Sequence, residues 1–303
     1  MISDMAKLRL KVLSGVPGFS NKEGIEQVIE NYFSAVEKYK VSEPQCLYEG
    51  DQLVAYMLTS RFYHRFYGNV LTQYIMDFDP DFAEQGIEFL SKQLAGKSHS
   101  DEFRLVELHA PCAALLEPLM EEWQIAATSL GGDPRVSLKR AQDKAEDLGA
   151  KNLEIRPASS LEEIERVMKI KLDAFKREPS LCWYWKCDQY QTQEFMRMVN
   201  SLSKSETYVL LEGEKVVGYG GIALEPQNAY WGSCSGIDLA LTDKYRGQGL
   251  SYSLYSFLFN EMTSRGAVFY KGATANPGVM KAAAYLERWP LFYQLLPKNF
   301  RVQ

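Results

Sequence analysis

The feature that most constrains the fold of this chain is an internal repeat. Residues 47–56 read LYEGDQLVAY and residues 210–219 read LLEGEKVVGY, so that Leu, Glu-Gly, Val and Tyr recur in register. A second match, Gln-Gly followed by Ile or Leu, places Gly86 and Gly249 at the same offset of 163 positions. Self-similarity at a fixed offset indicates repeated structural units. We therefore expect two similar α/β halves, 1–140 and 150–303.

Local patterns predict the elements of the second half. Ser160 followed by Glu163 has the form of a capping box and predicts a helix over 160–177. The polar stretch 137–152 reads as a helical join that ends at Gly149. Alternating or β-branched runs predict strands at 153–159, 207–212, 216–225, 229–242, 267–274 and 291–297, with helices from about 250 to 265 and from 277 to 289.

Composition excludes several classes of protein. The 303 residues are 46% hydrophobic and 24% charged, which is a globular composition, and the net charge of −5 argues against nucleic-acid binding. The sequence has no run of 18 apolar residues, so we expect no membrane-spanning helix. The first residues lack a signal-peptide pattern. The five cysteines are scattered, which favours reduced thiols in a cytoplasmic protein.

A glycine-rich turn follows the strand expected at 229–242. The sequence DKYRGQGLSYSL at 243–254 places Arg246, Gly247 and Gly249 directly before an apolar helical pattern. Unpaired N–H groups and the macrodipole make such a helix start favourable for an anion. Glycine lets the backbone approach closely, and the guanidinium matches phosphate oxygens. We expect a diphosphate to bind here.

Three phosphate-binding patterns compete for this turn. A Walker loop requires a Gly-Lys-Ser/Thr ending that is absent, and a dinucleotide fingerprint requires a third glycine where Tyr252 stands. RGQGLS at 246–251 resembles the R-x-x-G-x-[G/A] turn of the GCN5-related N-acetyltransferases, with Ser251 in the last position. Asn276 and Tyr285 also have the spacing of that family's Asn and Tyr, although the usual Gly-Phe ending lacks its glycine. The resemblance covers about 153–300.

The first half resembles this family only as a degenerate copy. Ala83 and Glu84 stand where Arg246 and Gly247 stand, and Glu88 replaces Ser251. Two carboxylates would repel a diphosphate. The resemblance therefore implies two domains of this fold, each with a mixed, mostly antiparallel sheet flanked by helices, and one working coenzyme A turn.

The resemblance implies acetyl transfer from acetyl-CoA to a primary amine of a small molecule or peptide by direct attack. The strand at 237–242 would pair with the pantetheine arm, the N–H groups of 247–251 would hold the diphosphate, and an amide near Leu241 would polarise the thioester carbonyl. The residues assigned to the donor are Leu239, Ala240, Leu241, Arg246, Gly247, Gln248, Gly249, Leu250, Ser251 and Asn276.

Catalytic roles are less constrained by the sequence. Tyr285 is the expected general acid, or else a packing tyrosine, and Asn276 either bonds the pantetheine or caps the helix that Pro277 starts. Asp238 is the first candidate for the general base, although strand alternation separates it from its neighbours. Ser235, Cys234, Glu225 and a chain of water molecules are the other candidates.

The remaining motifs are weaker. Aromatic residues crowd 181–190 and either hold a cationic acceptor or pack in the core, while Cys182 and Cys187 lack partners for a zinc site. GSCSG at 232–236 has the form of a hydrolase elbow, but all three histidines, His64, His99 and His109, precede it, so a Ser-His triad in hydrolase order is excluded.

Two other functions stay open. The chain could be a non-catalytic CoA-binding or scaffold protein, or it could transfer an acyl group to oxygen or use a longer acyl chain. We expect no metal, no nucleic acid and no membrane partner, and a monomer or homodimer.

Overall fold

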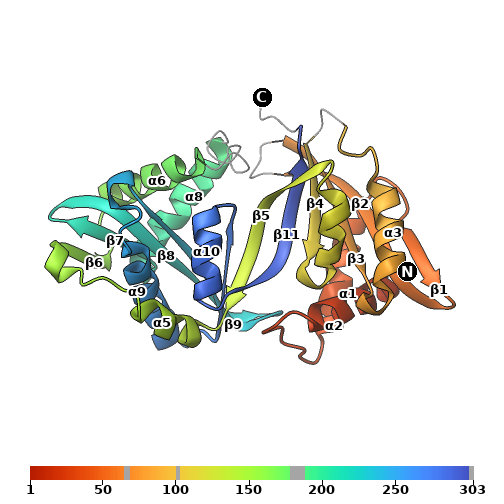
Figure 1. Cartoon of the computed structure of the whole chain (residues 1–303), viewed down its shortest axis with the longest axis horizontal. Helices are drawn as coiled ribbons and strands as arrows, with labels where there is room; N and C mark the ends of the chain where they lie inside the picture. Colours follow the sequence, from red (N-terminus) through yellow and green to blue (C-terminus); the bar gives the residue numbers. More distant parts are fainter. Residues whose placement is uncertain (65–68, 100–102, 178–187, 300–303) are drawn as a thin grey trace. The chain divides into compact units, whose positions relative to one another are not determined.

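The computed structural model describes residues 1–64, 69–99, 103–177 and 188–299 (Figure 1). The chain forms two compact units. The first contains Met1–Ser129 together with Pro290–Gln303, and the second contains Leu130–Trp289. Whether the halves 1–140 and 150–303 act as separate domains stays a prediction. In the described residues, no helix is both long and apolar enough to span a bilayer.

The first unit is built on a mixed sheet. Strands β1 and β2 and strands β2 and β3 pair antiparallel, β3 and β4 run parallel, and the C-terminal strand β11 pairs antiparallel with β4. Its elements are α1 (Ile2–Ser14), α2 (Ile25–Glu37), β1 (Gln45–Glu49), β2 (Gln52–His64), β3 (Asn69–Phe78), η1 (Pro80–Phe82), α3 (Ala83–Leu94), β4 (Phe103–His109), η2 (Ala110–Leu115), α4 (Leu116–Leu119), β5 (Trp123–Gly132) and β11 (Trp289–Pro297).

The second unit repeats this plan. Strands β6, β7, β8 and β9 pair antiparallel in chain order, and β10 runs parallel to β9. Its elements are α5 (Pro134–Gln142), η3 (Gly149–Lys151), β6 (Leu153–Pro157), α6 (Leu161–Phe175), α8 (Asp188–Ser201), η5 (Leu202–Lys204), β7 (Thr207–Glu212), β8 (Lys215–Asn228), β9 (Gly232–Leu241), η6 (Asp243–Tyr245), α9 (Leu250–Ser264), β10 (Phe269–Thr274) and α10 (Pro277–Tyr285).

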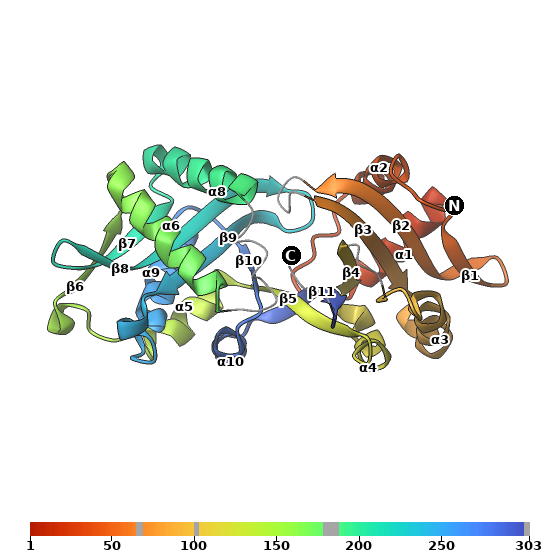
Figure 2. The same cartoon turned by 90° about the horizontal axis from the view of Figure 1, so that it is seen from above.

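Helices cover both faces of the sheet in the second unit. Figure 2 shows α6 and α8 on one side of β7 and β8 and α5 and α9 on the other. On the α6 side, Ile164, Val167 and Met198 pack against Val209 and Tyr219. Alternation along β9 sends Leu239 to the α9 side and Ala240 to the α6 side. The expected α/β class with a mostly antiparallel sheet is confirmed.

The hairpins confirm the internal repeat in detail. β1 and β2 turn at Gly50, and β7 and β8 turn at Gly213, each with φ of +61°. Both hairpins shift register once, between Leu47 and Tyr48 in the first and between Leu210 and Leu211 in the second. These are equivalent positions, so the two copies share a bulge as well as a turn, and bulges are specific features of a fold.

The predicted helix at 160–177 is also confirmed, because Ser160 Oγ accepts the N–H of Glu163 at 3.2 Å and caps α6. The predicted helix from 137 to Gly149 is only partly right, since α5 ends at Gln142. The next residues are irregular because the N–H of Glu146 donates to Ser253 Oγ of α9 at 2.9 Å instead of continuing a helix.

Candidate active site

The glycine turn lies between the end of β9 and the start of α9. Gly247 has φ of +71°, and Gly249, the N-cap of α9, has φ of +77°, values that a side chain would disfavour. None of the described side chains caps α9. The first N–H groups of this helix are therefore available to an anion from outside the turn.

Two side chains hold the shape of the turn. Arg246 Nε donates to the carbonyl of Leu241 at 2.8 Å and lies 3.6 Å from Asp243 Oδ1. Gln248 Nε2 donates to the carbonyl of Lys244 at 2.6 Å. Arg246 thus ties the turn to the last residue of β9 and places its positive charge beside the helix start.

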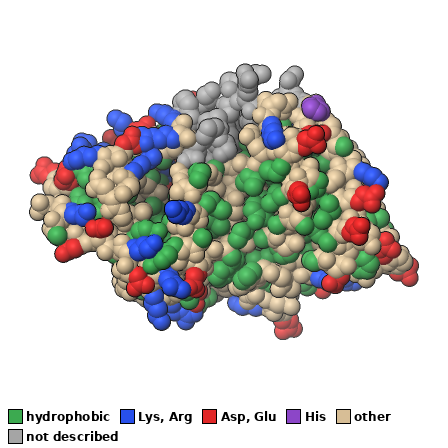
Figure 3. Space-filling model, in the orientation of Figure 1, with side chains coloured by type: hydrophobic (Ala, Val, Ile, Leu, Met, Phe, Trp, Pro, Cys, Tyr) green, Lys and Arg blue, Asp and Glu red, His purple; other side chains and the backbone are tan. Residues whose placement is uncertain are grey.

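The segment between α5 and η3 lies against this turn, which the sequence reasoning missed. A Cβ atom on Gly249 would lie only 2.9 Å from Glu146 Oε1, so the carboxylate of Glu146 covers the N-cap. Lys151 Nζ pairs with the same carboxylate at 3.4 Å. Figure 3 shows basic and acidic side chains close together where α5 and α9 lie. A diphosphate that binds at the turn would displace Glu146.

β9 separates from β10 before it reaches the turn. The two strands pair at three positions, from Phe269 with Cys234 to Lys271 with Gly236. β9 then continues to Leu241 and β10 to Thr274 without a further described pair. The backbone of 237–241 therefore has an edge on which an extended molecule could pair like an added strand.

The first unit lacks this opening. β3 and β4 pair at six positions, from Leu71 with Phe103 to Met76 with Leu108. Gly86 is not an N-cap, because α3 begins at Ala83 and Gly86 lies inside the helix. A Cβ on Gly86 would lie 2.6 Å from Phe78 Cβ, so this glycine serves close packing. The turn and the opening occur together only in the second copy, within the described residues.

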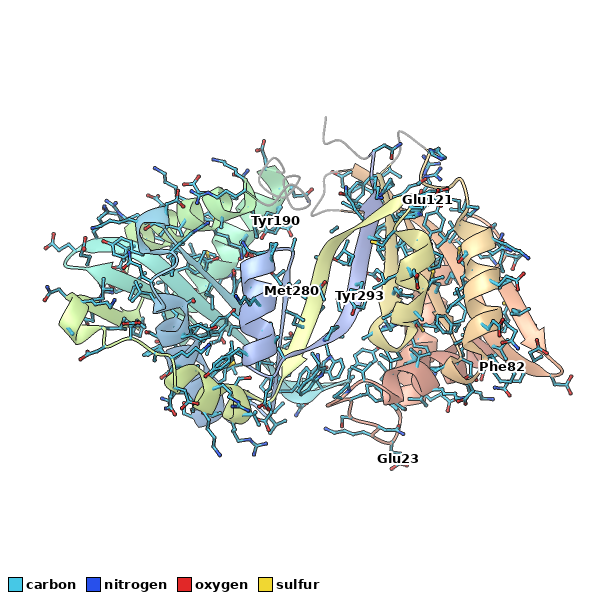
Figure 4. The ribbon with its side chains drawn as sticks, viewed as in Figure 1. Glu23, Phe82, Glu121, Tyr190, Met280 and Tyr293 are labelled. Carbon is cyan, nitrogen blue, oxygen red and sulfur yellow. The ribbon has the colours of Figure 1, made fainter. Side chains whose placement is uncertain are left out.

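Tyr285 is the last residue of α10, the helix on which Figure 4 labels Met280, and Asn276 directly precedes this helix. Tyr285 is half-buried and packs edge-to-face on Tyr252 of α9, with ring centroids 5.7 Å apart. Lys144 Nζ lies 3.6 Å from the Tyr285 ring centroid. Asn276 Oδ1 accepts the N–H groups of Gly278 and Val279 at 2.8 and 3.1 Å, so Asn276 caps α10. A bond from Asn276 to pantetheine stays a prediction.

Asp238 faces the other side of the sheet, toward α6 and α8. Lys171 Nζ of α6 donates to Asp238 Oδ2 and, at 2.8 Å, to Glu194 Oε1 of α8. Arg197 adds a second bond to Glu194 at 2.7 Å. Two cations thus neutralise two carboxylates, and Tyr219 also hydrogen-bonds Asp238. We call these four charged residues the charge cluster.

Burial and charge act against each other in the charge cluster. Burial disfavours the ammonium of Lys171, but Asp238 and Glu194 raise its pKa well above the usual value. Burial likewise disfavours the carboxylate of Glu194, but Lys171 and Arg197 lower its pKa to about 2. Lys171, Glu194 and Arg197, whose own pKa is also raised, are therefore charged at neutral pH. Lys171 could have been noticed in the sequence, because it lies four residues after Val167 on the apolar face of α6.

The other candidate bases are less favourably placed. Burial raises the pKa of Cys234 to about 11. Ser235 is fully buried and donates to the carbonyl of Gly236 at 2.8 Å. Burial disfavours the carboxylate of Glu225, but the hydrogen bond from Asn228 and the charge of Lys271 hold its pKa below the usual value. Glu225 is thus an ionised carboxylate at the closed end of β9, and its role as a base stays a prediction.

Some predicted features fall outside this geometry. Residues 181–187, with Cys182 and Cys187, lie outside the described residues. His109 is in the first unit, where its Nδ1 lies 2.8 Å from Asp77 Oδ1. Within the described part of the chain, no three His, Cys, Asp or Glu side chains form a candidate metal site.

Comparison with known proteins supports the predicted family over part of the chain. Residues 165–288 match the family described as "Acetyltransferase (GNAT) family". The chain is similar to the solved structure of a GNAT-family acetyltransferase from Colwellia psychrerythraea, with 14% identity, a TM-score of 0.50 and coverage of 98% of this chain and 96% of that one. It is also similar to the solved structure of a GCN5-related N-acetyltransferase from Sphaerobacter thermophilus, with 12% identity and a TM-score of 0.55. This match covers 96% of this chain and 90% of that one. No curated protein matches. Identities this low show the fold alone.

Proposed function

Because residues 165–288 match the Acetyltransferase (GNAT) family, we propose that this protein transfers an acetyl group from acetyl-CoA to a primary amine of a small molecule or peptide. The observation that carries the proposal is the junction at the end of β9. There, the strand leaves β10 and enters an uncapped glycine turn at the start of α9.

Each part of acetyl-CoA is assigned to one part of this junction. The N–H groups of 247–251 hold the diphosphate, with Arg246 as the nearby cation. The pantetheine arm lies in the opening and pairs with the backbone of 237–241. The thioester then points toward the closed end of the opening, so its carbonyl oxygen accepts an amide N–H of β9 that lies farther from the turn than the amide near Leu241 expected from the sequence.

Proton transfer is assigned to groups on opposite faces of the sheet. Tyr285 gives a proton to the leaving thiolate. Asp238 is the proposed acceptor of the proton from the amine, and its charge also attracts a cationic acceptor. Because Lys171 already pairs with Asp238, the acceptor amine has to compete with this internal amine.

One observation favours the alternative of a non-catalytic CoA-binding protein. Glu146 covers the donor turn and Lys171 covers the proposed base, so both ends of the site are occupied by side chains of the chain itself. In such a protein CoA would bind without turnover.

The test is release of free CoA from acetyl-CoA, followed with a thiol reagent, across a panel of primary amines. The proposal expects amine-dependent release that Tyr285→Phe slows. Lys281→Met, an exposed change on the same helix, serves as the control. Binding of acetyl-CoA without release for any amine would support the scaffold alternative.

A further inference from the structure

Arg288 is a buried cation that the proposed reaction does not use. It follows α10, and its N–H donates to the carbonyl of Ala283 at 2.9 Å. Its residue surface is 9% exposed, and its Nε has no hydrogen-bond partner in the described part of the chain. Among the described residues, no Asp or Glu forms an ion pair with Arg288.

The guanidinium lies where β9 and β10 part. A Cβ atom on Gly272 would lie 3.3 Å from Arg288 Nη2 and 2.9 Å from the carbonyl oxygen of Ile237. Gly272 and Ile237 come directly after the last paired residues, Lys271 and Gly236. Arg288 is thus at the closed end of the strand opening, on the face of the sheet that α9 covers.

The neighbours of Arg288 do not neutralise it. Its Cζ lies 5.2 Å from the centroid of Tyr270, and it hydrogen-bonds the hydroxyl of Tyr255. Burial raises the pKa of both phenols, although Arg288 acts in the opposite direction, so both stay uncharged at neutral pH. A buried charge without a counter-ion is costly, and an arriving carboxylate would relieve that cost with charge-assisted hydrogen bonds.

We propose that Arg288 binds a carboxylate at the far end of the donor's acyl chain, so that the preferred donor is a dicarboxylic acid monothioester of CoA. This inference rests on the proposed function. The diphosphate belongs to the turn at the open end, and Asp238 faces the opposite side of the sheet. A chain that extends past the thioester toward the closed end is the ligand that approaches Arg288.

The reaction itself is unchanged by this donor. The amine nitrogen attacks the thioester carbonyl carbon, a C–N bond forms and the C–S bond breaks. The amine loses its proton to the base, and the thiolate receives one from Tyr285. The distal carboxylate keeps its charge throughout, so Arg288 determines specificity and takes no part in bond making.

The experiment is calorimetric titration of the full chain with acetyl-CoA, butyryl-CoA and succinyl-CoA. Butyryl and succinyl chains have similar reach, but only succinyl carries a carboxylate. A hydrogen-bonded charge pair predicts succinyl-CoA to bind about 10- to 100-fold more tightly than butyryl-CoA. Arg288→Met should remove this preference and leave acetyl-CoA binding unchanged, Arg288→Lys should keep part of it, and the exposed Arg166→Met should keep all of it.

The outcomes separate the two proposals. If acetyl-CoA binds but succinyl-CoA binds no better than butyryl-CoA, the inference is overturned and the proposed function stands. If neither CoA nor any thioester binds, the proposed function fails, and the inference with it. The comparison of donors on the unaltered protein needs no variant, so it decides the question even if Arg288→Met does not fold.

Discussion

The charge cluster gives a stability prediction whose size follows from the structure. Glutamine mimics the protonated form of Glu194, so Glu194→Gln should cost what ionisation of this carboxyl contributes to folding. The pKa of Glu194 falls from 4.5 to about 2, which corresponds to roughly 3 kcal/mol at pH 7. The Glu194 side chain is only 11% exposed, so solvent screening does not reduce this value much.

The sign of the pH dependence follows from the lowered pKa. Because the folded protein holds the carboxylate more strongly than the unfolded chain does, this stabilisation is fully present above about pH 5. It is lost as the pH falls toward the folded pKa, and at pH 3 only about 1 kcal/mol should remain. The gap between the wild type and Glu194→Gln should therefore narrow as the solution becomes acidic.

The assay is urea unfolding at pH 7, 5 and 3, followed by circular dichroism, with the exposed Glu165→Gln of α6 as the matched control. The control should change the free energy of unfolding by less than about 0.5 kcal/mol at every pH. A loss below about 1 kcal/mol for Glu194→Gln at pH 7, or a loss that does not depend on pH, would refute the reasoning.

Three further predictions concern the donor site. Glu146→Gln removes the carboxylate that covers Gly249, so titration should show CoA binding about three- to tenfold more tightly, by about 1 kcal/mol; unchanged affinity would mean that Glu146 does not compete. Gly249→Ala should weaken CoA binding at least tenfold, because φ of +77° and the contact with Glu146 both oppose a Cβ atom; equal affinity would contradict an anion site at this turn. Tyr285→Phe should lower kcat about 10²-fold with little change in KM for acetyl-CoA, as steady-state kinetics would show; an unchanged kcat would leave Tyr285 a packing residue.

Local sequence signals sufficed for the turn and for the hairpins. The Glu-Gly pairs at Gly50 and Gly213 determine tight turns by themselves, because glycine accepts positive φ without a steric cost. The same tolerance of positive φ explains why glycine stands at position 249, in the turn before α9. Gly86 shows the limit of this reasoning, since an identical Gln-Gly pair lies inside a helix and packs on Phe78.

Contacts between residues far apart in the chain could not be predicted from the sequence. The apolar run at 291–297 predicts a strand, but nothing in it indicates pairing with β4 of the first unit, because register depends on partners far along the chain. Lys171 and Glu194 come from two helices and meet only in the folded protein. Glu146 and Lys144 look like ordinary charges in a polar join, and only their contacts with Gly249 and Tyr285 place them at the site.

The central claim is that one copy of the repeat binds acetyl-CoA and the other does not. The most direct test is the stoichiometry of acetyl-CoA binding by calorimetry, on the wild type, on Arg246→Glu and on Glu84→Gln in the first unit. The account predicts one site per chain, lost in Arg246→Glu and unchanged in Glu84→Gln. Two sites, or a single site that survives Arg246→Glu, would contradict it.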